Sequence, residues 1–141
     1  MENNALITVR SIQQFMDNPP EYIDLTSEGR IWEEDGILHL SYMESALTGL
    51  EGTETVFSLE GDCVVLERRG TVTSRMEFRC GEFYKSMYHS ADIGTLLITV
   101  GTTQIENNLE LSGGMLRVLY SIDIEDAGQG TVAYEITVVR R

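Results

Sequence analysis

The sequence predicts an all-β fold: a closed antiparallel β-barrel of about eight to ten short strands, with little helix. Three observations predict it. Turn-forming residues divide the chain of 141 residues into short segments, many of those segments alternate apolar and polar residues with a period of two, and no segment combines helical periodicity with helix caps. Because this length suits one hydrophobic core, we expect a single β-barrel domain over residues 1–141.

The N-terminal part of the chain predicts the first strands. In the segment 5–15 the odd-numbered residues are the more apolar set, so they are expected to face the core. The segment 21–34 is ambiguous. Asp35 and Gly36 suit the positive φ angles of a tight type I′ turn, which predicts a hairpin whose next strand covers residues 37–44.

Later segments show the same alternation more clearly. In each of them one set of alternate residues is apolar enough to face a core, while the intervening residues are polar. Each is therefore predicted to be a strand with one face exposed to water. The inward sets are Val72, Ser74, Met76, Phe78 and Cys80, then Leu116, Val118, Tyr120, Ile122 and Ile124, and finally Val132, Tyr134, Ile136 and Val138.

Net charge argues against two classes of partner, and the N-terminal sequence indicates the cellular compartment. The net charge is -13 at pH 7, which argues against binding to nucleic acid or to an anionic membrane surface. The N-terminus carries neither the basic residues nor the apolar run of a secretion signal, so we expect a cytoplasmic protein. In that reducing compartment Cys63 and Cys80 are expected to be free thiols.

Strand parity places three polar side chains in the expected barrel lumen. The alternation that buries residues 38 and 40 also turns Tyr42 and Glu44 inward, and the next hairpin does the same for Arg68. Because a buried charge must be paired or hydrogen-bonded, Glu44 and Arg68 could form a structural ion pair at a barrel end. Alternatively, Arg68 could bind a ligand carboxylate in two-pronged fashion. Tyr42, Glu44 and Arg68 are therefore the candidate ligand-binding residues.

No catalytic, metal-binding or cofactor-binding residue is predicted. His39 and His89 have no visible catalytic partner, and the chain lacks the short His or Cys spacings typical of zinc sites. Glycine pairs occur at turns between strands and not before a helix, so they do not predict a phosphate-binding loop.

Basic residues gather on one predicted outer surface. Arg69, Arg75 and Arg79 fall on the polar side of neighbouring strands and could contact an acidic partner or a second copy of the chain. Cross-strand pairing with Glu67 and Glu77 is the commoner outcome and is the one we expect.

Several short motifs follow one another in a recognisable order along the chain. They are Leu40-Ser41-Tyr42-Met43-Glu44, Thr48-Gly49-Leu50 with Thr53 and Thr55, Arg68-Arg69-Gly70, Met76-Glu77-Phe78, Gly94, and Gly113-Gly114 leading to Tyr120. Their order resembles the YwiB-like family of uncharacterised bacterial proteins. This resemblance implies a calycin-like, lipocalin-like β-barrel and implies no activity. The segment 88–94 departs from the family pattern, which has a turn with a proline and an aromatic residue there.

These observations favour a cytoplasmic binding or accessory module that holds a small apolar or amphipathic molecule in the barrel. Barrels of this size can enclose one small ligand or can be filled by their own side chains. The alternative is therefore a protein-interaction module with a solid barrel, acting as a homodimer or partner adaptor. A small hydrolase or isomerase with its site at the barrel mouth is a third interpretation.

Overall fold

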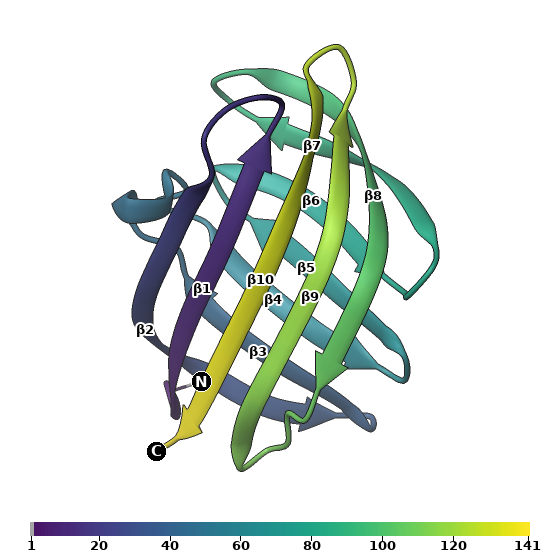
Figure 1. Cartoon of the computed structure of the whole chain (residues 1–141). Helices are drawn as coiled ribbons and strands as arrows, with labels where there is room; N and C mark the ends of the chain where they lie inside the picture. The colour runs from purple at the N-terminus through teal and green to yellow at the C-terminus, as the bar shows by residue number, and fades with distance from the viewer. Residues whose placement is uncertain (1) are drawn as a thin grey trace.

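Ten antiparallel strands close into one barrel in the part of the chain that the structure describes, residues 2–141 of a computed structural model (Figure 1). The strands follow chain order around the barrel, and β1 closes it by pairing with β10. The predicted closed antiparallel barrel is confirmed. The strands are β1 (Ala5–Phe15), β2 (Glu21–Glu34), β3 (Ile37–Met43), β4 (Glu54–Glu60), β5 (Cys63–Arg69), β6 (Val72–Phe78), β7 (Phe83–Ser90), β8 (Gly94–Asn107), β9 (Gly113–Ile124) and β10 (Gly128–Arg140).

Helix is confined to one short turn within residues 2–141. This 3-10 helix, η1 (Ala46–Thr48), lies in the connection between β3 and β4, and the Oγ of Ser45 caps it by accepting a hydrogen bond from the backbone N–H of Leu47. The described residues include no helix with the length and apolar character needed to cross a membrane.

The burial pattern follows the predicted alternation. Ala5, Ile7 and Val9 of β1 are buried, as are the alternate residues of β6 and of β10. Cys80 departs from its predicted inward position, because β6 ends before it and its side chain is exposed. The ambiguous segment forms the long strand β2, whose first residues, 21–29, pair with β1 and whose last residues, 29–34, pair with β3.

The Asp35–Gly36 turn is the predicted tight hairpin. Glu34 pairs with Ile37 across it, and both turn residues have positive φ angles, 53° for Asp35 and 78° for Gly36. These angles are those that a type I′ turn requires.

Replacing Gly36 with alanine is expected to lower the free energy of unfolding by about 1 kcal/mol, because alanine pays a steric cost at positive φ. A Cβ atom at this position would meet no atom within 4 Å, so conformation alone sets the cost. Urea unfolding measures the loss, and Asp35→Asn is the control because asparagine tolerates this conformation. An unchanged stability would contradict the expectation.

The two ends of the barrel differ in packing. Both chain termini lie at one end (Figure 1). The interior at this end is filled by large apolar side chains. We call this the packed end, and the opposite end, with the connections β1–β2, β3–β4, β5–β6, β7–β8 and β9–β10, the open end. The fully buried side chains of the packed half include Ile7, Ile31, Leu40, Leu116 and Ile136.

The barrel wall has one weak seam. Strands β6 and β7 pair at only two positions within the described chain, Val72 with Ser90 and Thr73 with His89. The preceding pair of strands, β5 and β6, is in register over five positions. Beyond Thr73 the chain bridges instead to β8, through Cys80 and Thr102.

Candidate functional site

Two adjoining cavities occupy the open end of the barrel, with volumes of about 280 and 300 Å³. The first lies toward β1, β2 and β3, and the second lies toward β8, β9 and β10. We call them together the inner cavities. Four residues line both of them: Gln13, Arg68, Tyr88 and Tyr134.

The three residues selected by strand parity meet in this region. Tyr42, Glu44 and Arg68 all line the first inner cavity. Tyr42 is near the end of β3 and Glu44 follows that strand directly, while Arg68 is near the end of β5. Strand β4 lies between these two strands, and Arg68 is opposite its Thr55 in the ladder. The inward orientation expected for all three side chains is therefore present.

The expected ion pair between Glu44 and Arg68 is not among the ion pairs of residues 2–141. Instead, Glu44 accepts hydrogen bonds from two hydroxyl groups. Thr48 donates to its Oε1 at 3.0 Å, and Thr55 donates to its Oε2. The physical reason for the difference is local: η1 brings Thr48 close to the carboxylate, so both of its oxygens are occupied without the guanidinium.

Arg68 therefore keeps an unsatisfied donor inside the protein. Its Nε atom is buried and has no hydrogen-bond partner among residues 2–141. Burial disfavours the charged guanidinium, but the neighbouring acidic groups Tyr134, Tyr120, Tyr42 and Glu44 hold the pKa of Arg68 above its usual value. The side chain is thus a permanent positive charge facing the inner cavities.

Tyrosines surround this charge. The hydroxyl groups of Tyr42 and Tyr134 are hydrogen-bonded at 2.8 Å, although the residues are far apart in sequence. Burial raises the pKa of both, and it raises the pKa of Tyr120 to about 12 against the opposing effect of Arg68. All three hydroxyl groups are therefore protonated at neutral pH and can donate hydrogen bonds.

Sequence reasoning missed part of the site. Ser74 faces the interior directly opposite Arg68 in the β5–β6 ladder, and its buried Oγ has no hydrogen-bond partner within the described part of the chain. Its inward position was available from the alternation in β6, but its relation to Arg68 depends on the register of two strands. Gln13 and Tyr88 were also missed, because they reach the cavities from distant strands.

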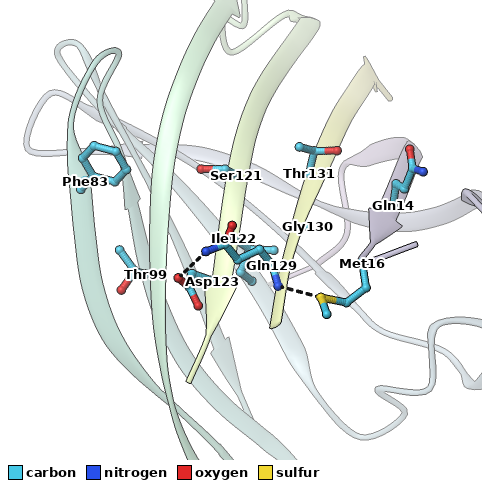
Figure 2. Close-up of a pocket in the computed structure, with 10 residues that line it drawn as sticks. All are labelled: Gln14, Met16, Phe83, Thr99, Ser121, Ile122, Asp123, Gln129, Gly130 and Thr131. Atoms are coloured by element: carbon cyan, nitrogen blue, oxygen red, sulfur yellow. Dashed lines mark hydrogen bonds between the residues drawn. The ribbon is translucent and has the colours of Figure 1, made fainter. Parts of the chain in front are cut away.

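A larger hollow, of about 500 Å³, lies on the outer wall across β8, β9 and β10 (Figure 2). Some of its groups are hydrogen-bonded to one another: the side chain of Gln129 donates to Asp123, and its backbone N–H donates to the sulfur of Met16. Phe83 at its edge lies against Gly101, where the missing side chain leaves room for the ring. We therefore place the functional site in the inner cavities, where a buried charge is unsatisfied.

The histidines lie away from the inner cavities. Nδ1 of His39 is hydrogen-bonded to Ser58 at 2.7 Å, and Nδ1 of His89 is hydrogen-bonded to Thr95 at 2.8 Å. Neither imidazole is among the residues lining the two cavities.

The basic outer surface pairs with Glu67 and Glu77, but only the ion pair between Arg75 and Glu67 is the expected cross-strand pair. The other two pairs each join residues of a single strand. Arg69 pairs with Glu67, and Arg75 pairs with both Glu67 and Glu77 at 3.1 to 3.4 Å. Arg79 pairs instead with the exposed Asp62. Because these arginines are exposed and already paired, their ion pairs contribute little to stability.

Comparisons with known proteins identify the family. None of the curated proteins matches the chain. Among solved structures it is similar to the crystal structure of the ywiB protein from Bacillus subtilis, with a TM-score of 0.85 and 21% identity, over 99% of this chain and 92% of that chain. The family described as a domain of unknown function, DUF1934, matches residues 7–136. The expected YwiB-like family is thereby confirmed, and the chain belongs to the DUF1934 family.

Proposed function

We propose that the protein binds a small amphipathic molecule in the inner cavities of its barrel. One observation carries this proposal: the only unsatisfied charged atom in the buried interior of residues 2–141, Nε of Arg68, belongs to a side chain that lines both cavities. A protein seldom retains such a group without a partner, because burying it costs free energy.

The lining of the cavities suits an amphipathic molecule. The second cavity has an apolar wall, whereas the first carries most of the polar side chains. Pockets of roughly 300 Å³ are at the lower end of the usual range for small-molecule sites, so the ligand is small. The apolar wall includes Phe15, Met76, Ile98, Ile122, Ile124 and Val132.

Filling the second cavity tests this function. Ile124 is half-buried at the end of β9 and lines the cavity, so Ile124→Trp is expected to weaken binding of the amphipathic probe anilinonaphthalene sulfonate about tenfold. Fluorescence titration measures the effect. Ser121→Trp, which places the same side chain on the exposed face of β9, is the matched control and should retain the wild-type affinity.

Equal binding to wild type and to Ile124→Trp would show that the probe does not occupy the lumen, and would contradict the proposal. Native mass spectrometry of freshly purified protein adds an independent measurement. An adduct of small-molecule mass supports ligand binding, whereas a bare dimer with no probe binding in the lumen supports the interaction module.

A further inference from the structure

The polar groups left unsatisfied near Arg68 share one chemical property. The guanidinium can only donate hydrogen bonds, and the hydroxyl of Ser74 needs an acceptor for its own hydrogen. The two residues are direct cross-strand neighbours, and such neighbours have Cβ atoms about 4.5 to 5.5 Å apart. The partner that is missing from both groups is therefore a hydrogen-bond acceptor.

The tyrosine pair supplies a third donor. In the hydrogen bond between Tyr42 and Tyr134 one hydroxyl donates and the other accepts, so only one of the two hydrogens is used. The other hydrogen is free to reach an acceptor in the first inner cavity, which both tyrosines line.

Glu44 does not fill this role. Its two carboxylate oxygens already accept hydrogen bonds from Thr48 and Thr55. Its negative charge is nevertheless close enough to act on Arg68, so one positive charge is partly balanced before any ligand arrives. A ligand with two negative charges would be repelled, whereas one with a single negative charge completes the balance.

The geometry points to a carboxylate: we infer that the ligand is a small amphipathic monocarboxylate whose head group binds Arg68, Ser74 and the tyrosine pair. The planar fork of a guanidinium matches a carboxylate in two-pronged fashion. The apolar tail lies in the second inner cavity, between Met76 and Ile98. This inference rests on the ligand-binding function proposed above and adds the chemical class of the ligand.

A series of ligands with the same octyl tail tests the head group. Isothermal titration at about pH 8, where a phosphate monoester is a dianion, compares octanoate with octanol, octyl phosphate and octylammonium. Octanoate is expected to bind at least about tenfold more tightly than any of the other three, because it alone offers a single negative charge to the guanidinium.

Variants assign the preference to Arg68. Arg68→Met is expected to bind octanoate and octanol equally, and Arg68→Lys to retain part of the preference for octanoate because it keeps the charge without the fork. Arg75→Met removes an exposed arginine from the neighbouring strand β6 and should change nothing. Circular dichroism checks that each variant is folded.

Four results would overturn the inference. Equal affinities of the wild type for octanoate and octanol would exclude recognition of a carboxylate head group. An undiminished octanoate preference in Arg68→Met would exclude its recognition by Arg68. Both results would leave the proposal of ligand binding in the lumen intact. Tighter binding of octyl phosphate than of octanoate would show that the site prefers a phosphate head group to a carboxylate. Failure of every octyl ligand, together with unaltered probe binding in Ile124→Trp, would overturn the proposed function itself.

Discussion

Replacing Arg68 with methionine is expected to stabilise the ligand-free protein by about 2 kcal/mol, which corresponds to a rise of about 4–8 °C in Tm. The unsatisfied Nε of Arg68 costs free energy in the folded state, and methionine fills a similar space without a charge. Glu44 does not depend on Arg68 for its hydrogen bonds, because Thr48 and Thr55 provide them. Thermal and urea unfolding measure the change.

The same variant distinguishes a binding residue from a structural one. If Arg68 were the ionic partner that holds Glu44 in place, removing it would destabilise the protein by about 3 kcal/mol or more. Arg75→Met is the control, since its exposed ion pairs contribute little and its effect should remain within about 0.5 kcal/mol. If Arg68→Met gains stability and loses octanoate binding, the role of Arg68 is to bind the ligand and not to stabilise the fold.

Stability is expected to fall steeply in alkaline solution. A tyrosine in an unfolded chain has a pKa of about 10, whereas burial raises the pKa of Tyr120 to about 12. The folded state therefore holds this proton more tightly, so the contribution of Tyr120 is complete below pH 10 and is lost as the pH rises to about 12. The difference amounts to about 3 kcal/mol for this one hydroxyl.

Urea unfolding between about pH 9 and pH 12 measures this loss. Tyr120→Phe should remove about 3 kcal/mol of the alkaline decline, and Tyr22→Phe is the control because that side chain is 73% exposed. Arg68→Met should leave the onset of the decline unchanged and extend it to higher pH, since the positive charge of Arg68 lowers the pKa of Tyr120 in the folded state. An identical pH dependence in wild type and Tyr120→Phe would show that another group is responsible.

Much of the fold could be predicted because the side-chain period of a strand is local. Alternation in the segments that became β6, β9 and β10 correctly separated core from surface. The same alternation predicted that Tyr42, Glu44 and Arg68 face a common lumen, and in the structure all three line one cavity. Their role in ligand binding stays a prediction.

Other features depend on positions that no local pattern contains. The contact between Tyr42 and Tyr134 joins strands at opposite ends of the chain, and the pairing of Ser74 with Arg68 requires the exact register of two strands. The prediction of an ion pair between Glu44 and Arg68 was wrong, because it considered only oppositely charged partners. Hydroxyl groups of Thr48 and Thr55 lie close enough to occupy the carboxylate instead. The inner cavities themselves result from the summed volumes of side chains on many strands.

The seam between β6 and β7 makes the barrel able to widen at one place in its wall. A ring of strands that is hydrogen-bonded throughout has a fixed circumference, but in the described chain β6 and β7 are paired only at Val72 and Thr73. Met76 and Tyr88, which line the second inner cavity, belong to these two strands. Moving β6 and β7 apart breaks few backbone hydrogen bonds. We therefore expect the diameter of the lumen to adjust to a bound ligand at little cost in folding free energy.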